Sequence, residues 1–516
     1  MKLNKAIIIL LLSVLVCCQD KQDQGQPVAV LLDPGQFKHH VDYFNRMEDE
    51  NIIQAIPNDE SWEWLARNIP FFECPQDNFE EMWYYRWWTL RKHIKETPQG
   101  YVMTEFLVEH SYADKYNLIS CALGHHINEA RWLHDPVYLD DDIQVWYRGN
   151  NNSPMKKLHK FSSWAAYALF DRYKVNMDRD FILDMLDDLA KDYHVWEGER
   201  MMPSGLFWQY DVQDGMEESI SGGRFTRNAR PTINSYMCGN AIALSEMATL
   251  AGNDELAQTF SKKAEMLREK ILDTLWNDQD QFFETLDENG KFLPVREAIG
   301  YIPWYFNLPG PEFEPAWQQV TDPEGFLAPF GLTTAERRHP EFRSHGCCNC
   351  EWDGAVWPFA TSQTMTALAN LLNRDNTRYV SDSVYFRLLE LYVESQYFQG
   401  RPYIGEYLDE TTGDWLKGDQ ERSRYYNHST FNDLVITGLV GLRPRADDII
   451  EVNPLLPPGQ WDWFCLDNIL YHEKVLTIFW DRDGTRYDRG KGLHLLVDGK
   501  EVARTDHLER IVFTLN

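Results

Sequence analysis

Amphipathic helices follow one another between about residue 77 and residue 442, and this pattern constrains the fold more than any other feature of the chain. In the segment 256–275 the apolar residues recur every three or four positions, which places them on one face of a helix. The segments 182–193 and 233–248 show the same spacing. The chain is therefore predicted to be mainly helical.

Short, turn-forming connections join some of these helices in pairs. Gly252 suits the left-handed C-terminal cap of one helix, and Asn253 or Asp254 suits the N-cap of the next. A connection this short makes the two helices run antiparallel. A second helical hairpin is predicted around residues 373–383.

Other helices are separated by long connections that are rich in Trp, Tyr, Gly, Asp and Glu, namely 196–231, 278–354 and 399–430. Long loops are unusual in a compact domain unless they carry a function. We therefore expect these connections to form the working face at one end of the helical assembly.

The apolar period changes from 3.6 to 2 after Arg443. Residues 475–480 alternate between two faces, and Asp498-Gly499 between apolar runs is a strong signal for a β-hairpin. Residues 446–516 are therefore predicted to form a small antiparallel, sandwich-like β domain.

The N-terminus has the pattern of an export signal. Lys2 and Lys5 precede an apolar run, Ala6 to Val16, that is too short to span a bilayer. The run ends in Leu15-Val16-Cys17-Cys18, which resembles the cleavage box of bacterial lipoproteins.

Residues 1–18 are accordingly predicted to be a lipoprotein signal peptide, with Cys18 lipidated and Cys17 as the alternative. Residues 19–30 would form a solvated tether. The protein is expected to be exported and lipid-anchored in the bacterial cell envelope, in the periplasm or at the cell surface. An uncleaved anchor or plain secretion is the alternative.

The net charge limits the possible macromolecular partners, and the cysteine content limits the possible metal sites. The chain has 50 Lys and Arg residues against 80 Asp and Glu residues, a formal net charge of -30. This charge repels nucleic acids and anionic membranes, so membrane contact is expected only through the lipid. Cys347, Cys348 and Cys350 supply three neighbouring thiols, but no fourth cysteine lies near them in the sequence to complete the four ligands of a zinc site. We expect a structural cysteine cluster, no metal and no cofactor.

Two acidic loops contain the candidate catalytic groups. The loop 203–219 places Asp211, Asp214 and Glu217 beside aromatic residues, where loss of hydration raises the pKa of a carboxyl group toward that of a general acid. Glu406 lies in a second acidic loop. Enzymatic cleavage of a glycosidic bond requires at least two carboxyl groups that face each other. A surface acidic loop and a simple turn are the structural alternatives.

Three segments resemble motifs of one family, in the same order along the chain. Gly215-Met216-Glu217-x-Ser219 resembles the Gly-Met-Asp-Asn-Ser acid motif of mannosylglycerate hydrolases and processing α-glucosidase I enzymes. Trp352-Asp353-Gly354-Ala355-Val356-Trp357-Pro358 is similar to their Trp-Arg-Gly-Pro-x-Trp motif. Glu406-Tyr407-x-x-x-Thr411-x-Gly413 is similar to the Glu-x-Tyr-x-x-x-Thr-Gly base motif that trehalases share.

The resemblance covers roughly residues 77–445 and identifies a six-hairpin glycosidase. It implies an (α/α)6 barrel over residues 31–445 with its pocket at one end, an inverting mechanism, Glu217 as general acid and Glu406 as general base. Glu217 replaces the Asp of the motif, which keeps Asp214 as an alternative acid. The β domain follows the helices, whereas it precedes them in the glucosidase relatives.

Further residues are expected to contact the sugar, because aromatic rings suit the apolar faces of pyranoses and polar edges suit hydroxyl groups. The candidates are Tyr85, Arg86, Trp208, Asp211, Trp352, Asp353, Trp357, Tyr425, Asn427 and His428. Asp353 stands where the family motif has Arg, which alters the expected sugar specificity. At least half of the Trp residues are expected to be core.

The leading prediction is an exo-acting glycoside hydrolase that releases a terminal sugar from an oligosaccharide. A non-catalytic glycan-binding lipoprotein would need an aromatic platform instead of opposed carboxyl groups. A polysaccharide lyase would abstract a proton with Tyr425, Asn427 and His428. A zinc-dependent enzyme with a cysteine nucleophile is the fourth reading, and a metal assay separates it from the others.

Overall fold

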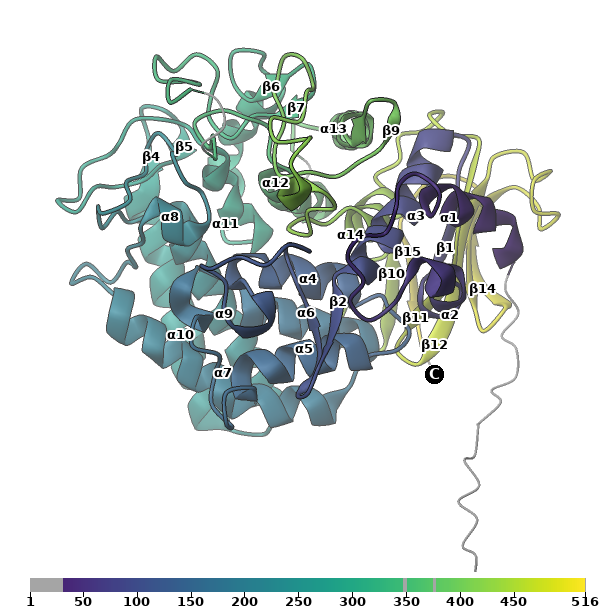
Figure 1. Ribbon diagram of the computed structural model, residues 1–516, viewed down its shortest axis with the longest axis horizontal. Coiled ribbons are helices and arrows are strands. Elements are labelled where there is room, and N and C mark those ends of the chain that lie inside the picture. Colours follow the sequence, from purple (N-terminus) through teal and green to yellow (C-terminus); the bar gives the residue numbers. More distant parts are fainter. Residues whose placement is uncertain (1–30, 347–349, 375–376, 516) are drawn as a thin grey trace, which may run out of the picture.

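The computed structural model describes residues 31–346, 350–374 and 377–515. The predicted export signal, the predicted tether, Cys347 and Cys348 lie outside the described residues. The chain is mainly helical and ends in an antiparallel sheet, as the change of period predicts (Figure 1). No described helix combines the length and the hydropathy needed to cross a membrane.

The longer helices arise from the amphipathic segments of the sequence. They are α3 (Asp77–Lys92), α4 (Leu123–Ala130), α5 (Val137–Arg148), α6 (Ala165–Asn176), α7 (Arg179–Arg200), α9 (Pro231–Leu250), α10 (Asp254–Lys270), α12 (Pro358–Arg374) and α13 (Asp382–Ser395). Their apolar stripes are buried in one continuous core. The large Trp83, Trp87 and Trp88 of α3 are almost completely buried, so these rings pack the core.

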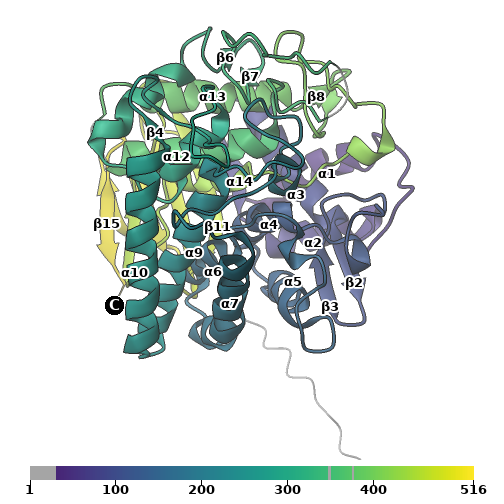
Figure 2. The ribbon, with the colours of Figure 1, turned by 90° about the vertical axis from the view of Figure 1, so that its left-hand side faces the viewer.

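The connection between α9 and α10 confirms the predicted hairpin. Gly252 has a φ of 70°, in the left-handed region. The side chain of Asn253 accepts a hydrogen bond from the backbone N–H of Leu256 at 3.1 Å and caps α10. The two helices pack along each other (Figure 2). Helices α12 and α13 also pack together, as the second hairpin predicts.

Helix contacts run around a closed circuit among the described elements. Helix α4 contacts α6, α6 contacts α9, and α9 contacts the short helix α11 (Ile302–Tyr305). Helix α11 contacts α12, and α14 (Asn432–Leu434) contacts both α12 and α4. These contacts link the six helices in one closed series.

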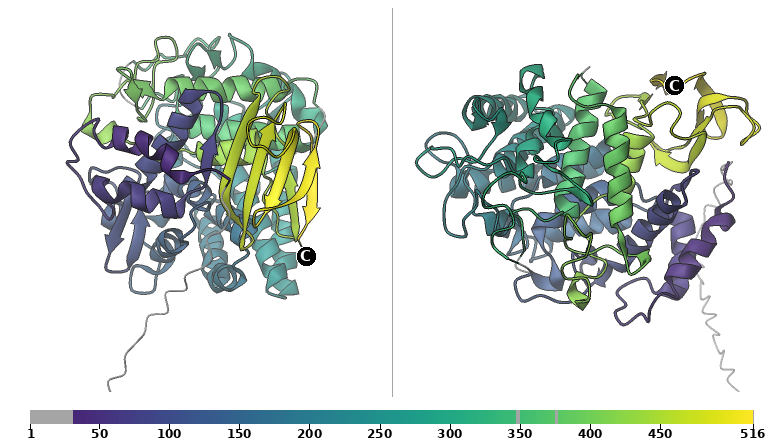
Figure 3. Two further views of the ribbon diagram at one scale, coloured as in Figure 1. Left: turned by 90° about the vertical axis from the view of Figure 1, so that its right-hand side faces the viewer. Right: turned by 90° about the horizontal axis from the view of Figure 1, so that it is seen from above.

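The C-terminal sheet takes one strand from the N-terminal part of the chain. Its order is β1 (Phe71–Glu73), β11 (Trp463–Tyr471), β12 (Lys474–Asp481), β13 (Gly492–Val497) and β14 (Lys500–Thr505). Strands β10 (Ile449–Val452) and β15 (Ile511–Thr514) pair separately. Figure 3 shows the yellow C-terminal sheet beside the purple N-terminal helices α1 (Lys38–Phe44) and α2 (Ser61–Asn68).

Local turn chemistry and one buried carboxylate set this arrangement. Asp498 and Gly499 both have positive φ, as the predicted two-residue hairpin between β13 and β14 requires. The carboxylate of Asp467 in β11 accepts the backbone N–H of Leu32 at 2.8 Å and also that of Leu31. The sheet thus holds the start of the described chain.

The long connections gather on one side of the molecule. The small strands β4 (Trp276–Asn277), β5 (Phe282–Phe283), β6 (Leu327–Ala328) and β7 (Gly331–Leu332) lie in and beside them, at the top of Figures 1 and 2. This is the side that the sequence indicated as the working face.

Candidate active site

A cavity with about 1030 Å³ of space, part of it open to solvent, lies among the three long connections. The connection 196–231 contributes Glu217, 278–354 contributes Cys350, and 399–430 contributes Glu406. Its wall is largely apolar, so a charged group in it loses much of its hydration. The structure therefore brings the two predicted carboxyl groups together from distant parts of the sequence.

The backbone around Glu217 is bent by two left-handed residues. Gly215 follows the short helix α8 (Asp211–Asp214) with a φ of 72°, and Glu218 has a φ of 66°. A Cβ on residue 215 would lie 3.2 Å from the Cβ of Cys121, so the glycine also permits a close approach. Burial, together with the charges of Glu406 and Asp211, raises the pKa of Glu217 to about 7. A carboxyl group of this kind keeps its proton near neutral pH.

Glu406 has a different electrostatic environment from that of Glu217. The Nζ atom of Lys417 lies 3.0 Å from its Oε2 atom, and a guanidinium nitrogen of Arg422 lies 3.4 Å from Oε1. The hydroxyl of Ser423 donates to Oε2 at 3.5 Å. Two cations thus lie beside the Glu406 carboxyl group, whereas Glu217 keeps its proton near neutral pH in the largely apolar cavity.

Asp214, the alternative acid, forms a buried ion pair. The Nε atom of Arg230 donates to it at 2.7 Å, and the hydroxyl of Ser162 donates at 2.7 Å. Both charged side chains are fully buried, and Asp214 is not among the residues that line the cavity. Asp211 also lies outside this lining, and it accepts the backbone N–H of Val212 at 2.6 Å. These two residues hold the loop that presents Glu217.

Trp357 and His428 are the predicted sugar contacts that line the cavity. The Trp357 ring stacks between Trp352 and Tyr407, with centroid separations of 4.6 Å on each side. Burial lowers the pKa of His428 well below its usual value, so the imidazole is neutral. Neither of its ring nitrogens has a hydrogen-bond partner among the described residues.

Trp352 and Asp353 support this wall from behind. Trp352 is buried against Trp357 and does not line the cavity. A carboxylate oxygen of Asp353 lies 3.1 Å from Nδ1 of His345 and accepts the backbone N–H of the same residue at 2.9 Å. The residue that replaces the motif Arg thus fixes a loop and lies behind the sugar pocket.

Four further predicted contacts do not line the cavity that holds Glu217 and Glu406. Arg86 donates to the backbone carbonyl of Ser429 at 2.6 Å and to Gln396 at 2.9 Å. Asn427 donates to the carbonyl of Thr104 at 3.1 Å. Trp208 lies between the guanidinium groups of Arg200 and Arg227, and Tyr85 packs against Trp88.

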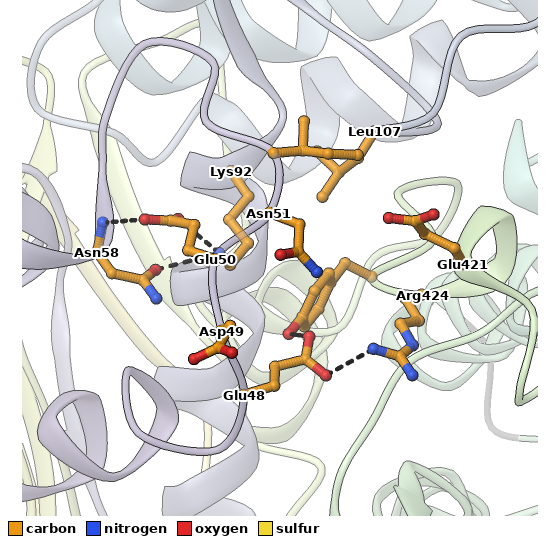
Figure 4. A pocket seen from close by; sticks show the side chains of 11 residues that line it. Glu48, Asp49, Glu50, Asn51, Asn58, Lys92, Leu107, Glu421 and Arg424 are labelled. Atoms are coloured by element: carbon orange, nitrogen blue, oxygen red, sulfur yellow. Dashed lines mark hydrogen bonds and ion pairs between the residues drawn. The ribbon is translucent and has the colours of Figure 1, made fainter.

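Tyr425 lines two other cavities and not the one that holds the carboxyl pair. Its hydroxyl donates to Glu48, and the same carboxylate pairs with Arg424 at 2.8 Å, as Figure 4 shows for the two charged side chains. The sequence predicts Tyr425 as a sugar contact, but its ring packs edge-on against Trp88, with the ring centroids 5.5 Å apart.

Three residues at the site were not predicted from the sequence, and for Glu105 the sequence contained no signal. Glu105 lines the cavity from the segment after β3 (Gly100–Met103), far from any acidic run. Lys417 and Arg422 could have been found as the basic residues of the third long connection, since a buried carboxylate needs a cation.

The described residues contain no group of three or more His, Cys, Asp and Glu side chains placed to hold a metal ion. Cys350 lies in the pocket, with its Sγ 3.8 Å from Oε1 of Glu406. Burial raises the pKa of its thiol to about 12, so Cys350 is a poor nucleophile at neutral pH.

Comparison with known proteins shows which family models the chain matches. Residues 115–429 match the model of the mannosylglycerate hydrolase MGH1-like glycoside hydrolase domain, and residues 442–504 match the C-terminal domain of glycosyl hydrolase family 65. The first match contains both carboxyl groups of the pair. The second covers most of the C-terminal strands.

Solved structures and one curated protein resemble the chain. A structure described as a sialidase is 63% identical with a TM-score of 0.92, covering 93% of this chain and 44% of that one. A GH63 mannosylglycerate hydrolase from Thermus thermophilus, solved with glucose, is 13% identical with a TM-score of 0.53, covering 69% and 98%. An uncharacterized protein of Borreliella burgdorferi is 22% identical over 147 residues, covering 28% and 30%.

This chain spans less than half the length of the sialidase-named protein and under a third of the curated one. The distant hydrolase structure supports the fold. The matched family model covers more than half of the chain and agrees with the three sequence motifs. The chain belongs to the family of mannosylglycerate hydrolase MGH1-like glycoside hydrolase domains.

Proposed function

We propose that the protein is an exo-acting, inverting glycoside hydrolase that releases a terminal sugar from an oligosaccharide. The observation that carries this proposal is the pairing of Glu217 and Glu406 in one cavity, one carboxyl group protonated and the other beside two cations. Unequal carboxyl groups of this kind are the acid and base pair of glycosidases.

In this mechanism Glu217 gives its proton to the glycosidic oxygen as the bond to the anomeric carbon breaks. Glu406 takes a proton from a water molecule, and the water oxygen attacks the anomeric carbon from the opposite face. The products are the free sugar, with inverted configuration, and the leaving alcohol. The mechanism requires the two carboxyl groups to lie about 6.5 to 9.5 Å apart, so that the water fits between them.

Two features support the exo mode and the proposed architecture. All three long connections close around one cavity, which favours insertion of a chain end over passage of a long polymer. The closed circuit of helix contacts supports an (α/α)6 barrel over residues 31–445, followed by the β domain. The indole of Trp357, held between Trp352 and Tyr407, adds an apolar edge to the cavity wall.

A panel of p-nitrophenyl glycosides and natural oligosaccharides tests the activity. The panel includes an aryl sialoside, because the relative that is 63% identical is described as a sialidase. We expect cleavage of a terminal sugar, release of the opposite anomer in proton NMR, and activity at least 100-fold lower in Glu217→Gln and Glu406→Gln. Retention of configuration would overturn the inverting mechanism.

The same assay addresses the other candidate functions. Binding of oligosaccharides without cleavage, unchanged in both Gln variants, would favour a glycan-binding protein. A lyase would give unsaturated products that absorb in the ultraviolet, but Tyr425 and Asn427 do not line the cavity that a lyase would use.

We also propose that the protein is held in the bacterial cell envelope by a lipid on Cys18. The basic start, the apolar run and the Leu-x-small-Cys ending of the first eighteen residues support this. Membrane fractionation of cells that express the wild type and Cys18→Ala tests the proposal. We expect the wild type with the membranes and the variant in the soluble fraction; equal distribution would contradict the anchor.

A further inference from the structure

Glu105 is a third carboxyl group in the pocket of Glu217 and Glu406, and it lies before the segment that matches the family model. Its side chain is 4% exposed although it lines the cavity. Its backbone carbonyl accepts the N–H of Asn427 at 3.0 Å, which ties the end of β3 to the third long connection. The residue is therefore held at the cavity wall by the fold.

The side-chain contacts of Glu105 differ from those of Glu406. The thiol of Cys121 lies 3.4 Å from its Oε2 atom, and the hydroxyl of Tyr426 is its other side-chain donor. No ion pair between described residues includes Glu105. Both neighbours can donate to oxygens of the carboxyl group, which also faces the cavity.

Burial raises the pKa of Glu105 to about 8, and the charges of Glu406 and Glu217 act in the same direction. The cations Lys160 and Arg422 also line the cavity, and Arg422 is paired with Glu406. Tyr112, Tyr426 and Cys121 remain protonated, because burial raises the pKa of each. The groups around Glu105 thus leave it neutral at physiological pH.

We propose that Glu105 stays protonated while the enzyme works and donates a hydrogen bond to a hydroxyl group of the sugar in the pocket. It is then a substrate-binding residue, separate from the acid and base pair. A buried carboxyl proton costs free energy when it has no hydrogen-bond acceptor, and a sugar hydroxyl in the cavity supplies an acceptor. The proposal rests on the proposed function because it takes this cavity as the sugar site.

The test compares Glu105→Gln, which keeps a neutral donor, with Glu105→Leu, which removes it. The probe is the monosaccharide that the wild type releases from the p-nitrophenyl glycoside it cleaves fastest, and its Kd is measured by calorimetry from pH 6 to 9.5. We expect the Leu variant to bind about 10- to 100-fold more weakly and the Gln variant within a few-fold of the wild type at pH 6.5.

The pH dependence gives a readout that a structural role does not move. Above pH 8 the wild type loses the proton, so its Kd is expected to rise about tenfold per pH unit relative to Glu105→Gln, which has no proton to lose. Asp142→Asn is the matched control. Asp142 is another buried carboxyl group with a pKa of about 8, but it bonds the backbone of Met103 and does not line the cavity.

Three results would overturn the proposal: wild-type affinity in Glu105→Leu, equal loss in both variants, or the same pH dependence in the wild type and Glu105→Gln. If Glu105→Leu fails to fold by circular dichroism, the pH comparison of Gln variant and wild type decides. If the wild type cleaves no glycoside, the proposed function fails, and the same titration with the monosaccharides of the panel still tests Glu105.

Discussion

Glu217 and Asp214 are three positions apart in one acidic loop, yet their surroundings give them different roles. Asp214 faces Arg230 in a buried ion pair, whereas Glu217 faces an apolar cavity and a second carboxyl group. Burial raises the pKa of Asp214 as well, but its carboxyl group is bonded to Arg230 and Ser162 and does not line the cavity, so it cannot reach a sugar there. The geometry therefore favours Glu217 as the acid.

Leaving-group dependence separates the two candidate acids. Glu217→Gln is expected to lower kcat/KM about 100- to 10 000-fold for a sugar leaving group, which needs a proton, but far less for an acidic dinitrophenol. Asp214→Asn is expected to lower the thermal stability and to leave the ratio of the two rates unchanged. Steady-state kinetics with both substrates checks this. A leaving-group effect in Asp214→Asn alone would reverse the assignment.

The pH profile follows from the same carboxyl group. Because Glu217 has a pKa of about 7, it is protonated below that pH and loses its proton above it. The value of kcat/KM is therefore expected to fall about tenfold per pH unit from pH 7 to 8, and more steeply above pH 8, where Glu105 also loses its proton. A pH series from 5 to 9 measures this limb. A fall that still begins near pH 7 in the residual activity of Glu217→Gln would show that another group titrates there.

Other residues show why single positions are difficult to assign from sequence. His428 and Tyr425 were both expected at the sugar, but only His428 lines the cavity. The backbone of Tyr425 is left-handed, with a φ of 57°, so the chain turns here and the side chains of Tyr425 and His428 face different cavities. No pattern in the sequence indicates that turn, so side-chain direction in a loop had to come from the structure.

Among the secondary-structure elements, substitution of two glycines measures how backbone conformation affects stability, because an added Cβ would meet no neighbouring atom at either position. Gly252 ends the α9–α10 hairpin at a φ of 70°, whereas Gly198 lies inside α7, and a Cβ would meet nothing within 4 Å at either position. Gly252→Ala is expected to lower the free energy of unfolding by about 1 kcal/mol, because alanine disfavours the left-handed region.

Gly198→Ala is the matched control and is expected to change stability in the opposite direction. Alanine loses less conformational entropy than glycine in a helix, so the variant gains about 0.5 to 1 kcal/mol. Urea unfolding of the two variants beside the wild type measures both effects. Equal shifts in one direction would contradict the assigned backbone conformations.

The hairpin elements could be predicted because their signals are local. Apolar spacing, Gly252 and Asn253 act within a few residues, and the structure shows the cap that they indicate. Strand β1 had no such signal, since three residues, Phe71–Glu73, pair with β11 almost four hundred positions later. Its conformation is decided by its partner strand and not by its own propensity.

At the scale of the whole molecule, several buried carboxyl groups make stability depend on pH. Burial raises the pKa of Glu105, Asp142 and Glu284 to about 8 and that of Glu217 to about 7. The folded protein therefore binds more protons than the unfolded chain between about pH 4 and 8. The stability that these groups contribute is present below that range and is lost as pH rises through their folded pKa values.

We accordingly expect a lower Tm at pH 9 than at pH 6, measured by differential scanning calorimetry. In Asp142→Asn one of the four carboxyl groups cannot ionise, so the difference between the two pH values is expected to shrink. A Tm that is constant or rises toward pH 9 would contradict the raised pKa values.

The helical class, the hairpins, the change to β structure, the acidic loops and the family motifs could all be predicted from the sequence, because each depends on residues close together in the chain. The fold alone brings Glu217 and Glu406 into one pocket, pairs Asp214 with Arg230 away from it, and adds Glu105 to the cavity wall. Burial and charge act through distances in space, and these exist only after the long connections have closed around the cavity.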